Sequence, residues 1–186
     1  MRGRISNAVL SGSVAAIVAA LAALILAGSA DAQLKTGSAE IKAVTGRVEV
    51  ERKGQTQWLP AAVGQKLVEG DNIRAWAGGS ARLDLIDGST IFLAENSRLA
   101  IGKLEFDQQN QAREALFHLA VGKVRAVVSQ TAVKLVKARQ SNFSISTQTA
   151  VAAVRGTDFE VTYDDQLQVM RIAVLPESGP VKGDGS

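Results

Sequence analysis

VEGDNIRAWAGGSARLDLIDGSTIFLAENSRLAI, residues 68–101, is the stretch that decides the fold of this chain. Short runs of alternating apolar and polar residues are separated there by Gly-Asp, Gly-Gly-Ser and Asp-Gly-Ser turns. Every second residue from Ala81 to Leu85 is apolar, which predicts a strand with one buried face, because strand side chains alternate with period two. Asp87-Gly88 predicts a tight hairpin turn with positive φ angles. The stretch therefore predicts a meander of short β-strands.

The same alternation recurs on both sides of this stretch. At Gly122 the apolar positions change phase, which indicates a β-bulge or a sharp corner. Residues 106–114 are polar and rich in Gln, and we expect a loop there. The chain is therefore predicted to be mainly β, with further strands near residues 47–51, 117–121, 124–128, 143–147, 159–163 and 166–174.

The first 32 residues have the order of a secretory signal peptide. Two arginines precede an uncharged apolar run at residues 8–27, and residues 30–32 (Ala-Asp-Ala) have the small-x-small form of a cleavage site. We expect cleavage between Ala32 and Gln33. A retained membrane anchor is the alternative, because the run is long enough to span a bilayer. In both cases the positive-inside rule predicts a periplasmic or secreted domain, or one anchored in the inner membrane and facing the periplasm.

The rest of the chain is of single-domain length. We expect a linker at residues 33–43, a β domain at 44–175 and a flexible tail at 176–186, where Pro and Gly break the periodicity. The sequence has no Cys and one His, which leaves no basis for a disulfide framework or a Cys/His zinc site. No metal and no cofactor are expected.

Several segments of the chain resemble the FecR-domain proteins, which are named for a periplasmic iron-citrate sensor. The most specific is AVRGTDF at residues 153–159, and the others are TGRVEV (45–50), GQKLVEGDNIRA (64–75), GGSARLDLIDGSTIFL (78–93), GKV (122–124) and FSISTQTAVAAVRGTDFEV (143–161). The resemblance implies a compact all-β domain of short antiparallel strands, like a β-sandwich or a β-solenoid. Sensors of this family carry a cytoplasmic anti-sigma segment, and we do not expect one in the seven residues before the apolar run.

The residues that carry the resemblance are interpreted as structural. We expect Gly156 to serve a bulge or a positive φ rather than a ligand, and Arg155 to donate a hydrogen bond to Asp71 or Asp158. The full set consists of turn glycines, turn acids and the residues around the last motif: Gly46, Gly64, Gly70, Asp71, Gly79, Asp87, Gly88, Gly122, Arg155, Gly156, Thr157 and Phe159.

A block without carboxylates runs from Ala115 to Thr157 and carries six basic residues. A one-signed face attracts anionic partners, which outside the cytoplasm are acidic proteins, phospholipid headgroups or anionic glycans and not nucleic acid. The alternative is a solvated face that only keeps the protein soluble. The candidate face for an anionic partner consists of Lys123, Arg125, Lys134, Lys137 and Arg139.

No catalytic constellation stands out in the sequence, and we expect a protein that is not an enzyme. No Ser lies in a G-x-S-x-G setting, and no acid–base pair of carboxylates can be assigned. Trp58 and Trp76 are either sugar-stacking platforms or packing residues. The first hypothesis is a binding or scaffold module for a protein or an anionic envelope partner. A membrane-tethered transducer that regulates an anti-sigma or receptor system in trans is the second, and an enzyme acting on cell-wall glycan is the third.

Export gives the first testable expectation. Protein isolated from the cell envelope should begin at Gln33, because the small-residue site directly follows the apolar run. N-terminal sequencing together with the intact mass measures this directly. A chain that keeps residues 1–32 would instead support the anchored form.

Overall fold

The computed structural model describes residues 35–107, 112–129, 141–154 and 157–176. These residues form strands and turns without a helix, which confirms the expected mainly β fold. The predicted signal peptide lies outside the described residues, as does the predicted tail apart from Pro176. The strands are β1 (Lys35–Thr36), β2 (Ala39–Thr45), β3 (Val48–Glu51), β4 (Trp58–Pro60), β5 (Lys66–Leu67), β6 (Asn72–Ala75), β7 (Ser80–Leu85), β8 (Thr90–Leu93), β9 (Ser97–Asp107), β10 (Ala112–Val127), β11 (Ser141–Ser146), β12 (Val151–Val154), β13 (Asp158–Asp164) and β14 (Val169–Leu175).

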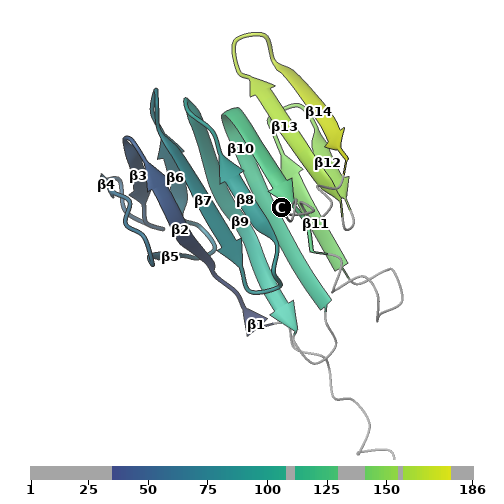
Figure 1. Cartoon of the computed structure of the whole chain (residues 1–186), viewed down its shortest axis with the longest axis horizontal. Coiled ribbons are helices and arrows are strands. Elements are labelled where there is room, and N and C mark those ends of the chain that lie inside the picture. The colour runs from purple at the N-terminus through teal and green to yellow at the C-terminus, as the bar shows by residue number, and fades with distance from the viewer. Residues whose placement is uncertain (1–34, 108–111, 130–140, 155–156, 177–186) are drawn as a thin grey trace, which may run out of the picture. The chain divides into compact units, whose positions relative to one another are not determined.

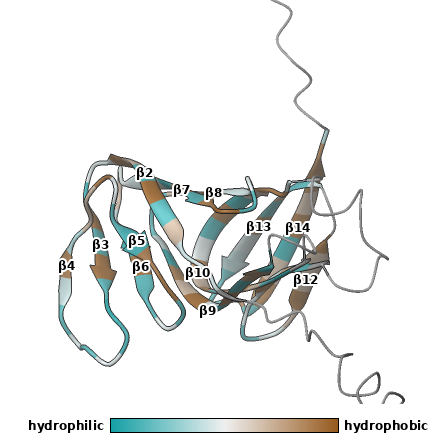
Figure 2. Cartoon of the chain, turned by 90° about the horizontal axis from the view of Figure 1, so that it is seen from below, coloured by the Kyte–Doolittle hydropathy of each residue, from teal (hydrophilic) through white to brown (hydrophobic). Residues whose placement is uncertain are grey.

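The strands join into one sheet that curls into two facing layers (Figure 1, Figure 2). One layer contains β1, β3, β4, β6, β9, β11 and β12, and the other contains β2, β5, β7, β8, β13 and β14. Strand β10 belongs to both, because residues 112–121 pair with β9 while residues 122–127 pair with β8 and β13. The pairs are antiparallel except β10–β11, which is parallel. The fold is therefore sandwich-like, with β10 as the strand that connects the layers.

The corner predicted at Gly122 is the point where β10 changes layer. Its φ is 95°, and the pairing of β10 with β9 shifts register between Leu119 and Val121. A Cβ at Gly122 would lie 2.3 Å from Ser97 Oγ and 2.6 Å from the carbonyl oxygen of Asn96. Both the backbone angle and the close approach of the chain therefore require glycine at this position.

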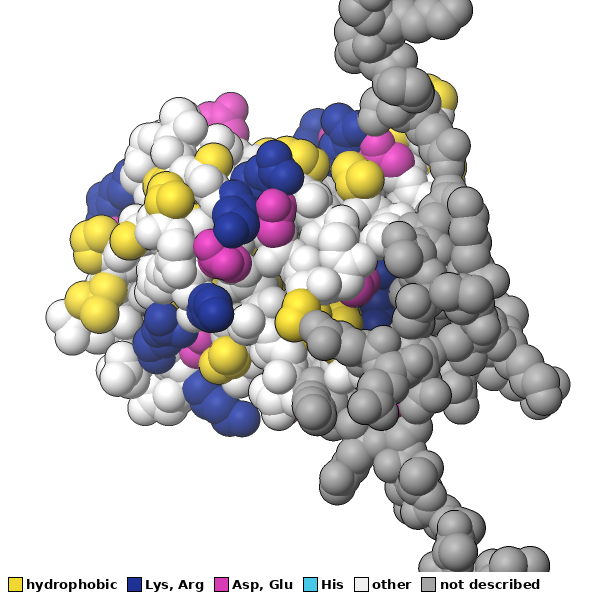
Figure 3. Space-filling model, turned by 60° about the horizontal axis from the view of Figure 1, so that its bottom comes forward, with side chains coloured by type: hydrophobic (Ala, Val, Ile, Leu, Met, Phe, Trp, Pro, Cys, Tyr) yellow, Lys and Arg dark blue, Asp and Glu magenta, His cyan; other side chains and the backbone are white. Residues whose placement is uncertain are grey.

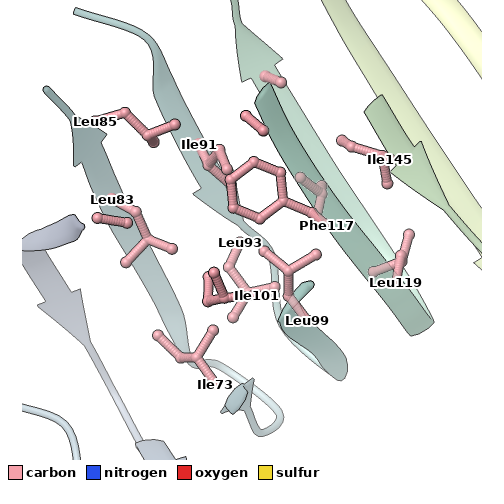
Figure 4. Packing of buried hydrophobic residues seen from close by; sticks show 14 of the residues in the cluster. Ile73, Leu83, Leu85, Ile91, Leu93, Leu99, Ile101, Phe117, Leu119 and Ile145 are labelled. Atoms are coloured by element: carbon pink, nitrogen blue, oxygen red, sulfur yellow. The ribbon is translucent and has the colours of Figure 1, made fainter. Parts of the chain in front are cut away.

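Apolar side chains from the inner faces of both layers fill the space between them (Figure 4). Three aromatic rings connect the layers near β10. The centroids of Phe117 and Phe143 are 5.4 Å apart, and Phe143 meets Phe159 of the other layer edge to face at 6.1 Å. The core also includes Ile73, Leu99, Ile101 and Leu119 from one layer and Leu83, Leu85, Ile91 and Leu93 from the other.

The expected linker at residues 33–43 is wrong, because strands β1 and β2 begin inside it. Strand β2 pairs with β7, and Ala39 and Ile41 are fully buried. The pairing shifts register between Ile41 and Ala43, so that the apolar alternation is broken after two residues. Because of this bulge, the periodicity of apolar residues does not predict strand β2.

The expected loop at residues 106–114 is also too long. Strand β9 continues to Asp107 and β10 begins at Ala112. Phe106 is 6% exposed, and Arg113 is 1% exposed. Arg113 can be buried within this polar run because its charge is neutralised by Asp87, which is distant in sequence.

The hairpin between β7 and β8 has the predicted glycine but not the predicted pair of angles. Gly88 has a φ of 81°, whereas Asp87 does not have a positive φ. The amide of Gly88 donates to the carbonyl of Leu85 at 3.0 Å, and the amide of Leu85 donates to the carbonyl of Ser89 at 2.8 Å. The connection is therefore longer than a two-residue turn, with one left-handed residue.

Alanine substitutions at two glycines with positive φ should lower the free energy of unfolding by different amounts. Gly88→Ala meets no atom closer than 3.6 Å, so that only the left-handed angle opposes it, at about 1–2 kcal/mol. Gly122→Ala adds a clash with the backbone of residues 96–97, and we expect a loss of about 2–5 kcal/mol. Chemical denaturation of both variants measures the difference. Equal losses would contradict the assignment of Gly122 as the corner.

Candidate recognition surface

The glycines of the predicted motif set serve turns distributed over both layers. Positive φ angles occur at Gly46, Gly64, Gly70, Gly88 and Gly122. A Cβ at Gly79, where φ is not positive, would lie 2.6 Å from the carbonyl oxygen of Arg47. These residues do not gather into one site.

The other motif residues are buried anchors or lie outside the description. Phe159 is fully buried in the core, and the carbonyl of Thr157 accepts a hydrogen bond from Val128 at 3.3 Å. Arg155 and Gly156 lie outside the described residues, so that the predicted hydrogen bonds of Arg155 stay predictions.

Asp71 is 1% exposed and fixes the turns around β3 and β6. Its carboxylate accepts hydrogen bonds from the amides of Lys53 and Val68, each at 3.0 Å. Its cationic partner among the described residues is Arg52, with Nη1 2.7 Å from Oδ2. This network satisfies the carboxylate inside the protein, which supports the structural interpretation of Asp71.

Asp87 forms an ion pair that joins the two layers. The fully buried side chain of Arg113, on β10, donates from Nη1 to Asp87 and to Ser89 Oγ, the latter at 2.9 Å. Within the described part of the chain, Nε and Nη2 of Arg113 have no hydrogen-bond partner. Sequence reasoning missed Arg113 because a charged residue in a polar run is normally exposed. Removing one partner of such a pair leaves a buried charge, so the pair constrains the turn after β7.

The predicted one-signed face is wrong for its described members. Lys123 and Arg125 do lie on one side of β10, but the antiparallel neighbour β13 places Glu160 opposite Arg125 and Asp158 opposite Val127, so that a carboxylate lies diagonal to each cation. Lys123 Nζ is 3.3 Å from Glu160, and Arg125 binds Asp158 through both Nε and Nη2. These hydrogen bonds raise the pKa of Arg125.

Lys134, Lys137 and Arg139 lie outside the described residues. On the face drawn in Figure 3, basic side chains lie among acidic and apolar ones. A carboxylate-free block in the sequence therefore does not become a carboxylate-free face where the structure describes it.

A layered cluster of aromatic and cationic side chains lies on the outer side of β3, β4 and β6. We call it the Trp–Arg stack, and it consists of Arg47, Glu49, Trp58, Arg74 and Trp76. The guanidinium carbon of Arg74 lies 4.0 Å from the ring centroid of Trp58 and 4.8 Å from that of Trp76. The guanidinium carbon of Arg47 lies 4.8 Å from the ring centroid of Trp76. The order along the stack is therefore Trp58, Arg74, Trp76, Arg47.

Strand register brings these residues together. Glu49 on β3 lies opposite Arg74 on β6, and Glu51 on β3 lies opposite Trp58 on β4. Trp76 follows β6 directly, and its amide donates to the carbonyl of Arg47 at 3.0 Å. Three members of the stack therefore lie on paired strands, and Arg47 and Trp76 directly adjoin the ends of β3 and β6.

Glu49 is the common acceptor of the Trp–Arg stack. Its Oε1 accepts from Arg47 Nε at 2.9 Å and Nη2 at 2.8 Å, and its Oε2 accepts from Arg74 Nε at 2.8 Å and Trp76 Nε1 at 3.0 Å. These bonds, with that from Trp76 having the largest effect, lower the pKa of Glu49 from 4.5 to about 2. One carboxylate therefore holds two guanidinium groups and one indole in fixed positions.

The stack is an organised surface with apolar and cationic parts. Trp76 is 41% exposed, and the side chain of Arg47 is 66% exposed. Two arginines and one glutamate leave the cluster with a net positive charge. The two tryptophans were candidates from the sequence, whereas Arg47, Glu49 and Arg74 were not predicted. The available signal was the alternation of polar and apolar residues at 47–51 and 72–74, but which of these side chains meet depends on which strands pair.

No metal centre is assembled in the part of the chain that the structure describes. No three His, Cys, Asp or Glu side chains gather there to hold an ion. His118 is half-buried, with Nδ1 3.1 Å from Ser146 Oγ. No helix among the described residues has the length and hydropathy needed to span a membrane.

The structure is an all-β domain that carries an ordered cluster of aromatic and charged side chains, the Trp–Arg stack, on its surface. The FecR protein family matches residues 71–175, more than half of the chain, and the chain belongs to that family. FecR proteins are a non-enzymatic signalling and regulatory family that typically faces the cell envelope. No curated protein and no solved structure is detectably similar to the chain.

The depressed pKa of Glu49 predicts a dependence of stability on pH. Because the folded state favours the ionised carboxylate, this stabilisation is fully present above the ordinary pKa of 4.5 and is lost as the pH falls towards about 2. Glu49→Gln should lower stability at neutral pH and flatten the stability curve in that interval. Thermal unfolding across this pH range tests the prediction.

Glu40→Gln is the matched control for this experiment. Glu40 forms an exposed pair with Lys42, and such surface pairs contribute about 0–1 kcal/mol. If Glu49→Gln and wild-type curves run parallel through the acid range, Glu49 does not organise the stack.

Proposed function

We propose that this chain is a non-catalytic FecR-family module of the bacterial cell envelope that recognises an acidic protein partner through the Trp–Arg stack. The observation that carries the proposal is the exposed, preorganised arrangement of two tryptophans and two arginines around Glu49. The proposal includes export by the predicted signal peptide and no cofactor.

The chemistry of the Trp–Arg stack favours a protein partner. Trp and Arg are the residues most enriched among those that contribute strongly to protein–protein binding. Among the described residues, Nη1 of Arg47 and Nη1 of Arg74 make no hydrogen bond, so that both can donate to a carboxylate. Because Glu49 already fixes the side chains, binding requires little further ordering.

Stacking of a sugar ring is less well supported. Arg74 and Arg47 lie over the ring of Trp76, and Arg74 also lies over that of Trp58. A sugar needs an open aromatic face, whereas an acidic protein segment can approach the exposed edges and the guanidinium groups. The stack therefore fits a carboxylate-bearing protein surface better than a neutral glycan.

Substitutions in the stack should reduce capture of the envelope partner. We expect Trp76→Ala and Arg47→Ala each to cost about 2 kcal/mol of binding, roughly a 30-fold loss of affinity. Cross-linking in intact envelopes, followed by quantification of the captured proteins, compares each variant with the wild type.

Phe92→Ala on the outer side of β8 is the control. Phe92 is 39% exposed, and the guanidinium groups of Arg82 and Arg125 lie 5.8 and 6.0 Å from its ring centroid, so that its surroundings are similar to those of Trp76. This variant should keep the partner. Equal capture by all variants would contradict the role of the Trp–Arg stack.

Family membership favours one other function, that of a signal transducer acting in trans on an anti-sigma or outer-membrane receptor system. The FecR domain is found in iron-uptake signal transducers. A transducer requires that deletion of the gene changes transcription of receptor genes when an inducing iron chelate is added. Unchanged transcription would leave the scaffold function as the better explanation.

A further inference from the structure

The C-terminal strand β14 is an edge strand without the features that normally protect such an edge. Among the described strands it pairs only with β13. Its seven residues, VMRIAVL, contain no proline and one charge, and its pairing with β13 has no register shift. Natural proteins usually protect an exposed edge with charges, proline or a bulge, because its free backbone groups bind other strands.

Strand β14 extends the apolar inner face of the layer that contains β13, but part of this extension is not covered by other residues. Met170, Ile172 and Val174 lie opposite Tyr163, Val161 and Phe159, which are at most 1% exposed. Met170 packs against the core, but Ile172 is 50% exposed and Val174 is 68% exposed. Figure 1 shows β14 at the opposite margin of the strand array from β4. Two core-facing apolar side chains therefore remain accessible to solvent.

We infer that β14 pairs with β14 of a second copy of this chain, in an antiparallel register centred on Ile172. In this register the facing pairs are Ile172–Ile172, Arg171–Ala173, Met170–Val174 and Val169–Leu175. The strand is thus complementary to itself, as a two-fold symmetric contact requires. Ile172 of one copy covers Ile172 of the other, and Val174 packs beside Met170.

Charge selects the register of the two β14 strands. Arg171 is the only charged residue of β14 and faces Ala173 in this register, so that no like charges lie opposite each other. A register centred on Arg171 would place two guanidinium groups face to face, which destabilises a strand pair. Seven residues from each copy are far fewer than the roughly 20–30 residues a side of a standard stable interface. The dimer is therefore reversible and depends on concentration.

Sedimentation velocity of the protein purified from the envelope, over a concentration series, tests the inference. The wild type should sediment increasingly as a dimer as its concentration rises. Ile172→Lys places two ammonium groups at the symmetry axis and should weaken association at least tenfold. Val63→Lys is the control, because Val63 is an apolar residue outside β14 with 64% exposure, and it should associate like the wild type.

A second variant tests the register itself. Ala173→Lys introduces a cation opposite Arg171 of the other copy at two symmetric places, while within its own chain it lies opposite Glu160 of β13 and is accommodated there. Such like-charge pairs across the symmetry axis should weaken association by about 2- to 30-fold, with a smaller loss at high salt. A wild type that stays monomeric at every concentration overturns the inference, as does Ala173→Lys that associates like the wild type. A monomer in which Ile172 is protected from solvent in footprinting would show that another part of the chain covers the strand.

Discussion

The corner in β10 sets the geometry of the whole sandwich, because this one strand supplies hydrogen-bonding edges to both layers. Its first part pairs with β9 and β11, and its last six residues pair with β8 and β13. The strand can turn from one layer into the other only where the backbone has a positive φ and comes against Ser97, which is the position of Gly122. Disorder of β10 in one layer would therefore also remove hydrogen-bonding partners from the other layer.

Much of the fold could be predicted from the sequence because it is determined by local patterns of apolar, polar and glycine residues. Alternation between Ala81 and Leu85 identified β7, the glycine at 88 identified the hairpin, and the phase change at Gly122 identified the corner. The errors occurred where a bulge or a distant charge overrides the local pattern. The bulge after Ile41 concealed β2, and the ion pair with Asp87 allowed Arg113 to be buried in a polar run.

The candidate surface was less accessible to sequence reasoning, because its chemistry arises from strand pairing. Glu49 and Arg74 are distant in the sequence and become neighbours only through the register of β3 and β6. The same cause accounts for the cations at 123 and 125, whose carboxylate partners come from β13. Charge along the chain predicts charge on a surface only when the neighbouring strands are known, and here those strands carry the opposite sign.

The dependence of three side chains on Glu49 limits how this surface can change over evolutionary time. A substitution of Glu49 alone leaves two guanidinium groups close together without their shared acceptor. A substitution of Trp76 alone removes the ring that separates Arg74 from Arg47. Single steps away from the present arrangement are therefore unfavourable, and we expect the five positions to be inherited or replaced together. A glutamate at position 49 in a related chain would then mark the presence of the whole cluster.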